Sequence, residues 1–167
     1  ARSMIFSVCM HELSHVYMAS SQGDDTAARM GYVTLDPLKL MGWQSLLALA
    51  FIGIAWGAVP VTPSRFRHRH SHALVSAAGP GANLVLAALF TLVAVLAVRF
   101  APSFEMAAAF DWFFSLGAML NCALAILNIL PIPMFDGWEV AAYFAPRLNQ
   151  IPREQRMQGG WIALMLI

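Results

Sequence analysis

The chain has 167 residues, of which 59% are hydrophobic and only 11% are charged, and its formal net charge is +1. Soluble domains carry about 25% charged residues, so this composition argues against a soluble protein. The near-zero net charge gives no reason to expect a nucleic-acid partner. We therefore expect an all-α integral membrane protein.

Apolar stretches separated by polar or proline-rich segments organise the chain. The third stretch is long enough to cross about 30 Å of hydrocarbon at about 1.5 Å per residue. The chain begins and ends inside apolar stretches, so we expect residues 1–167 to be one domain cut from a longer protein. The apolar stretches cover residues 4–19, 43–59 (interrupted by Gly53 and Gly57), 73–98, 106–130 and 161 onward, and the expected loops cover residues 20–40, 61–71, 99–105 and 131–160.

The first apolar stretch contains the pattern H-E-x-x-H at His11 to His15. On a helix, His11 and His15 share one face and can occupy two corners of a tetrahedral zinc site. Glu12 follows the first histidine and can act as general base towards the attacking water. The alternative is a pair of hydrogen-bonded core histidines with no metal.

A third ligand is expected at Asp136, because Pro131 and Pro133 break the fourth apolar stretch just before it. A broken helix in a membrane is tolerated where it lines a cavity. The alternative is an ordinary helix end followed by a turn. Weaker candidates for the third ligand are Asp24, Asp25, Asp36, Glu105, Asp111 and Glu139.

Positive charge is uneven among the loops. Three arginines lie between residues 65 and 69 and three between residues 147 and 156, whereas Arg99 stands alone in its loop. Positively charged loops stay in the cytoplasm, so the first two loops are expected there and the Arg99 loop outside. His68, His70 and His72 interleave with the first set; they suggest either a metal-binding tract or, as we expect, a basic surface beside the membrane.

A shared site imposes a condition on topology. His15 and Asp136 must lie at the same depth, and the third and fourth stretches make one crossing out and back. The second stretch, residues 43–59, must then enter and leave by the cytoplasmic face. Its glycines and its closing Pro60 suit such a re-entrant or interfacial segment. We therefore expect a polytopic helical bundle with a re-entrant segment between the first and second core helices.

With these motifs in hand, the chain resembles the site-2 protease family of intramembrane zinc metalloproteases, in particular its short bacterial and archaeal members without a PDZ insert. The resemblance covers most of the chain in the family's order. It is carried by residues 11–15, 23–27 with 31–39, 56–63, 78–83 (similar to the start of a core helix) and 128–137.

The resemblance implies one zinc ion held by His11, His15 and Asp136, with Glu12 as catalytic base. It also implies that Asn128 helps to hold the substrate or to stabilise the oxyanion. The alternative for Asn128 is an interhelical hydrogen bond, which we expect for Asn121; Asn83 suits either role. The chain departs from the family at Ala58, Phe135 and Trp138, which puts substrate handling rather than the metal ligands in question.

The expected function is hydrolysis of peptide bonds within or near transmembrane segments of membrane proteins. The expected partners are a transmembrane protein substrate and the lipid bilayer, without nucleic acid. The expected location is a prokaryotic cell membrane with the site towards the cytoplasm. A metal-ion transporter or channel and a catalytically silent scaffold are the alternatives, and the sequence leaves the oligomeric state open.

Overall fold

The computed structural model describes residues 2–100 and 107–165, and all regular elements in these ranges are helices. The predicted all-helical class is therefore confirmed for this part of the chain. In chain order the elements are α1 (Arg2–Ser21), α2 (Thr26–Arg29), α3 (Pro37–Leu40), α4 (Gly42–Ile52), η1 (Pro63–Arg65), α5 (Ser71–Phe100), α6 (Ala107–Ile129), α7 (Asp136–Phe144), η2 (Pro146–Gln150) and α8 (Arg153–Met165).

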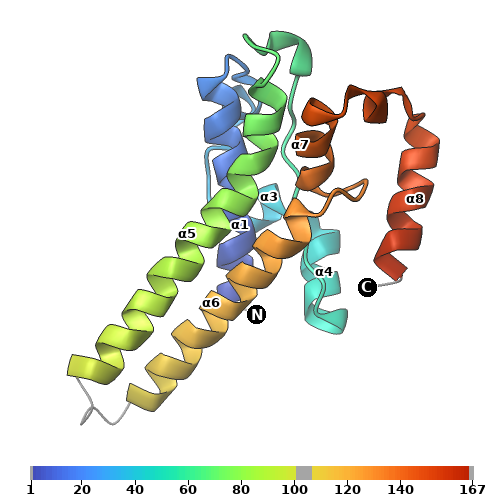
Figure 1. The fold of residues 1–167 in the computed structure, drawn as a ribbon. Helices are drawn as coiled ribbons and strands as arrows, with labels where there is room; N and C mark the ends of the chain where they lie inside the picture. The colour runs from blue at the N-terminus through green and yellow to red at the C-terminus, as the bar shows by residue number, and fades with distance from the viewer. Residues whose placement is uncertain (1, 101–106, 166–167) are drawn as a thin grey trace.

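Helices α5 and α6 form a long antiparallel pair, and α1 lies along the N-terminal half of α5 (Figure 1). Small side chains allow this close packing. A Cβ atom on Gly117 of α6 would lie 2.3 Å from the ring of Phe90 on α5, and Ala87, Ala94 and Ala118 are buried. Small residues at helix contacts are typical of helix packing in membranes.

Two helices in the described ranges, α5 and the Ala108–Ile129 part of α6, are long and apolar enough to cross a membrane. Their outer faces expose large apolar side chains, among them Leu84 and Leu92 on α5 and Met119 on α6. Exposed apolar surface of this extent marks a face that another apolar phase covers. The arrangement fits the two expected core spans.

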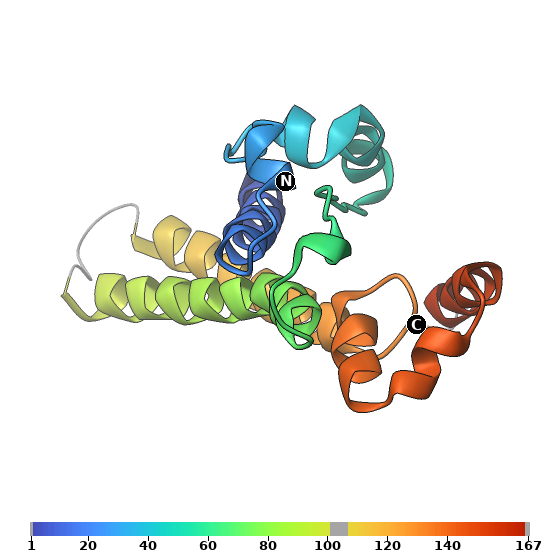
Figure 2. The same ribbon diagram turned by 90° about the horizontal axis from the view of Figure 1, so that it is seen from above.

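The apolar stretch 43–59 does not form one continuous helix. Helix α4 ends at Ile52, and Gly53 caps it in the left-handed conformation with φ of 76°. Residues 54–62 then return without helical structure (Figures 1 and 2). Ser45 on α4 ties the return segment down, since its hydroxyl donates to the Trp56 carbonyl at 2.6 Å and accepts from the Trp56 N–H at 2.9 Å. The chain thus reverses direction at Gly53.

Three segments that were expected to be loops contain helices, and that prediction is wrong for them. Residues 20–40 include α2 and α3, residues 61–71 include η1, and residues 131–160 include α7, η2 and the start of α8. These helices are short, and a short helix shows little apolar periodicity. A local signal does exist for α3: Asp36 caps it by accepting the Leu38 N–H at 2.9 Å, and Pro37 takes the first helical position.

The arginines that flank α5 lie at two opposite ends of the α5–α6 pair. The segment before α5, with its arginines, and the α7–α8 connection both lie at one end (Figure 1). Arg99, near the C-terminus of α5, lies at the other end. This separation of positive charge is the one expected from the sequence.

Candidate metal centre

Helix α1 presents His11 and His15 on one face. No proline or glycine interrupts α1 between Arg2 and Ser21, so the i, i+4 spacing is preserved. The two rings lie edge to face with centroids 4.8 Å apart. Both residues are buried, each with 7% of its surface exposed.

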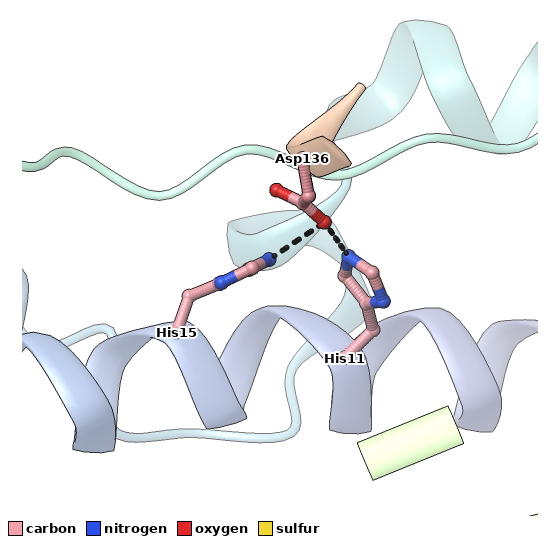
Figure 3. Close-up of side chains that lie close together, drawn as sticks. All are labelled: His11, His15 and Asp136. Carbon is pink, nitrogen blue, oxygen red and sulfur yellow. Dashed lines mark ion pairs between the residues drawn. The ribbon is translucent and has the colours of Figure 1, made fainter. Parts of the chain in front are cut away.

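Asp136, the first residue of α7, meets these histidines from across the molecule (Figure 3). Its Oδ2 atom lies 3.0 Å from Nε2 of His11 and 3.4 Å from Nε2 of His15. One ligand atom from each of the three residues falls within 4.8 Å of the others. The preceding turn carries Met134 with φ of 93°, an uncommon conformation for a residue other than glycine. The structure thus brings together the three residues expected to hold metal.

The far side of each imidazole ring makes a short hydrogen bond. Nδ1 of His15 lies 2.7 Å from the carbonyl oxygen of Val75. Because a carbonyl can only accept, Nδ1 of His15 must carry the proton. Nδ1 of His11 lies 2.6 Å from Oδ1 of Asn83, which is an acceptor of the same kind. In the neutral rings, both Nε2 atoms therefore direct lone pairs towards Asp136.

The donor set fits a zinc ion. Oδ2 of Asp136 is buried and has no hydrogen-bond partner, although two ring nitrogens lie close to it. The two distances are short, yet no hydrogen bond forms, because in the neutral rings neither Nε2 atom has a proton to donate. Two nitrogen lone pairs and a carboxylate oxygen facing one point repel each other unless a cation lies between them. Two imidazoles and one carboxylate are ligands that suit zinc and leave a fourth position open.

The ionisation of Asp136 also supports a metal site. Burial acts to raise the pKa of this carboxyl group, but hydrogen bonds and positive charge from the two imidazoles, when these carry a second proton on Nε2, outweigh burial and lower the pKa to about 2. The carboxylate is therefore ionised at neutral pH. An ionised carboxylate is the form that binds a metal ion.

Two glycines allow other segments to reach this site. A Cβ atom on Gly79 of α5 would lie 2.5 Å from Nε2 of both His11 and His15. A Cβ atom on Gly57, in the return segment after α4, would lie 2.5 Å from Oε1 of Glu12. Neither role was predicted from the sequence; the signal was only a glycine inside an apolar stretch. Gly79 and the rest of residues 78–83 lie well inside α5, not at its start.

Glu12 is buried, with 6% of its surface exposed, and lies against the backbone of Gly57. Asn128, in the last turn of α6, donates its side-chain N–H to the Leu124 carbonyl at 2.9 Å. This amide therefore bonds to its own helix. Its expected role towards substrate stays a prediction.

The other acidic candidates that the structure describes have different partners. Asp24 binds Thr26 and Thr62, Asp25 pairs with Arg29 and Arg65, Asp36 caps α3, and Glu139 pairs with His72. Asp111 accepts from Ser115, and Glu105 lies outside the described residues. Within residues 2–100 and 107–165, no second group of three His, Cys, Asp or Glu side chains gathers as closely.

Asparagines on two further helices extend the site. Asn121 of α6 bonds to Asn83 of α5 at 2.9 Å and to Ser7 of α1 at 2.8 Å. The predicted interhelical role of Asn121 is therefore confirmed. Asn83 has the interhelical role, since it contacts Asn121 on α6 and His11 on α1. Its other expected role, towards the substrate, stays a prediction.

Known proteins resemble this chain along nearly its whole length. The model of peptidase family M50 matches residues 97–167, a stretch that includes Asp136. YwhC of Bacillus subtilis (strain 168), provisionally named a zinc metalloprotease, is 35% identical over 99% of this chain and 77% of its own length. Rip2 of Mycolicibacterium smegmatis, named in the same way, is 36% identical over 91% of this chain and 57% of its own length. Rip2 of Mycobacterium tuberculosis (strain H37Rv) is 35% identical over 91% of this chain and 57% of its own length.

No solved structure gives a significant match. The chain spans just over half the length of the two Rip2 proteins, at 57%, and about three quarters of YwhC, at 77%. The matches confirm the predicted family, the predicted enzyme class of zinc metalloprotease, and zinc as the cofactor; the transporter and scaffold alternatives are not favoured. The chain belongs to peptidase family M50.

Proposed function

We propose that the chain hydrolyses peptide bonds of transmembrane proteins at a site built from α1 and the start of α7. The observation that carries this proposal is the convergence of His11 and His15 Nε2 on Asp136 Oδ2. These three residues would hold the zinc ion. When bound, zinc activates water and polarises a carbonyl group.

Glu12 is the proposed general base. It follows the first ligand on α1 and is buried beside the site, so its carboxylate can take the proton of an attacking water and return it to the leaving amine. Asn128 is the proposed donor to the substrate backbone. Its single described hydrogen bond is to its own helix, and an amide keeps a second N–H for another acceptor.

The proposed membrane topology has α5 and α6 as spans, and α4 with residues 54–62 as a segment that enters and leaves by one face. The reversal at Gly53 supports this topology. The arginines that gather at one end of the α5–α6 pair support a cytoplasmic location for that end. The position of the candidate site towards the same end is supported by two contacts with the first turns of α5: His15 bonds to the Val75 carbonyl, and Glu139 of α7 pairs with His72.

The proposed substrate is a transmembrane helix that is locally unwound. A helical backbone has its carbonyl groups hydrogen-bonded and shielded, so a scissile bond must leave the helix before Glu12 and zinc can reach it. Hydrolysis also needs water, which fits a site near a membrane face rather than at the centre of the bilayer.

The test uses proteoliposomes that contain the purified protein and a panel of single-span proteins tagged at both ends. We expect cleavage products with the wild-type chain and none with Glu12→Gln, which keeps the size of the side chain and removes its basicity. Zinc content should be equal in the two proteins. Cleavage of the same substrate at an equal rate by Glu12→Gln would contradict the proposal.

A further inference from the structure

A chain of buried hydrogen bonds links the candidate metal site to all three long helices. From His11 on α1 it runs to Asn83 on α5 at 2.6 Å, then to Asn121 on α6 at 2.9 Å, and back to Ser7 on α1 at 2.8 Å. Ser7, Asn83 and Asn121 have no exposed surface. Such groups have no water to bond with, so each must find its partner within the protein.

The direction of this chain is fixed by backbone carbonyl groups. Nδ2 of Asn121 also lies 2.8 Å from the Gly117 carbonyl, which can only accept. The amide of Asn121 is therefore oriented with its N–H groups towards Gly117 and Ser7 and its oxygen towards Asn83. The Ser7 hydroxyl is free to accept from Asn121 because it donates its own proton to the Ser3 carbonyl at 2.8 Å.

The orientation of Asn83 follows from that of Asn121. Because Oδ1 of Asn121 accepts, Nδ2 of Asn83 must face it and donate. Oδ1 of Asn83 then faces His11, so Nδ1 of His11 must donate. A neutral imidazole with its proton on Nδ1 has its lone pair on Nε2, the atom that faces Asp136.

We propose that Asn83, oriented by Asn121, is a positioning residue that holds His11 in the tautomer and ring orientation that bind the metal. The inference rests on the proposed metal site. For His15 the same task falls to the Val75 carbonyl, which no side-chain substitution removes. For His11 it falls to a side chain, so it can be tested directly.

A purely structural role for Asn83 makes a different prediction. If the amide only joined α5 to α6, its loss would lower stability and leave the metal affinity of the folded protein unchanged. A positioning role predicts weaker metal binding in protein that is still folded. Partners that orient a ligating histidine typically change metal affinity by about 10–100-fold.

The experiment compares Asn83→Leu with Asn83→Asp in the full chain. Leucine removes the acceptor for His11 and keeps a similar volume. Aspartate keeps the acceptor and loses the donor to Asn121. Zinc affinity is measured by competition with a chelator, and the absorption spectrum of the cobalt(II) form reports the ligand set. Asn83→Ala replaces the leucine variant if leucine prevents folding.

We expect Asn83→Leu to bind zinc about 10–100-fold more weakly than the wild-type chain and to show an altered cobalt spectrum. Asn83→Asp should lose less affinity than Asn83→Leu, because a carboxylate accepts the same bond from Nδ1. Wild-type zinc affinity in folded Asn83→Leu or Asn83→Ala would overturn the inference. An equal loss in the leucine and aspartate variants would also overturn it.

His11→Ala separates this inference from the proposal on which it rests. If His11→Ala binds zinc as the wild-type chain does, the proposed metal site and the inference are both wrong. If His11→Ala loses zinc and folded Asn83→Leu keeps it, the metal site stands and the positioning role is wrong. If both variants bind zinc more weakly and Asn83→Asp loses less affinity than Asn83→Leu, both statements hold.

Discussion

Gly79 of α5 lies directly against His15 of α1, so close that a Cβ atom at position 79 would be 2.5 Å from Nε2 of the ring. That distance is well inside van der Waals contact. The same Cβ atom would be 2.5 Å from Nε2 of His11. The absence of a side chain at position 79 therefore makes room for both ring nitrogens that face Asp136.

Gly79→Ala should displace both rings and lower zinc affinity by at least about tenfold. Gly81→Ala is a matched control on the same helix, because a Cβ atom there meets nothing within 4 Å. It should keep wild-type zinc binding and raise helix stability by up to about 1 kcal/mol. The check is zinc content after dialysis of both variants. Equal zinc in both would show that the contact at position 79 does not shape the site.

Gly57→Ala should act on Glu12 instead of on the metal ligands. A Cβ atom at position 57 would lie 2.3 Å from Cγ of Glu12, so the carboxylate must move. We expect the rate of substrate cleavage to fall by about 100-fold or more, in line with the loss of a general base. The zinc content should stay at the wild-type level, unlike that of Gly79→Ala. Unchanged cleavage would mean that Glu12 is not held by this contact.

Labelling of introduced cysteines tests the re-entrant topology. Leu38 and Ser64 flank α4 and its return segment and are both exposed, and Arg99 lies at the far end of α5. In a background with the exposed Cys122 replaced by serine, cysteines at positions 38 and 64 should react with a membrane-impermeant reagent from one side only. A cysteine at position 99 should react from the other side. Labelling of positions 38 and 64 from opposite sides would contradict the shared-site topology.

Asp24 links the end of α1 to the return segment and should make stability depend on pH. Burial acts to raise its pKa, but hydrogen bonds from Thr26 and from the Thr62 N–H outweigh burial and hold the pKa below its ordinary value. A lowered pKa in the folded state gives stability above the unfolded value of about 3.9 and loses it as pH falls through the folded value.

Asp24→Asn should therefore lower the free energy of unfolding by about 1–3 kcal/mol at neutral pH. The difference in unfolding free energy between this variant and the wild-type chain should shrink below about pH 4. Asp25→Asn is the neighbouring control. Its carboxylate is 40% exposed and pairs with Arg29 and Arg65 at the surface, so the expected change is below about 1 kcal/mol. Thermal unfolding in detergent at several pH values measures both. If the difference in unfolding free energy between Asp24→Asn and the wild-type chain stayed constant down to pH 3, the proposed role of the Asp24 carboxylate would be wrong.

The sequence carried enough information to predict the proposed ligands. The i, i+4 spacing of His11 and His15 needs only a helix to place both on one face, and the prolines before Asp136 marked the break that frees it. The fold brings these residues together as expected. Asn121 was predicted as an interhelical contact because a buried amide in an apolar helix must bond to another group.

The details that depend on packing between distant segments could not be predicted. Nothing in the sequence near Gly79 or Gly57 shows which side chain from α1 will lie against it. The link from Asn83 to His11 joins residues 72 positions apart. Helix α7 was missed because it is short and begins within the segment that supplies Asp136.

The most direct test of the central claim is the zinc content of the purified chain beside the His15→Ala and Asp136→Ala variants. This measurement needs no known substrate and joins two motifs that lie far apart in the sequence. We expect one zinc ion per wild-type chain and loss of zinc from both folded variants. Full retention of zinc by Asp136→Ala would contradict a site shared between α1 and α7.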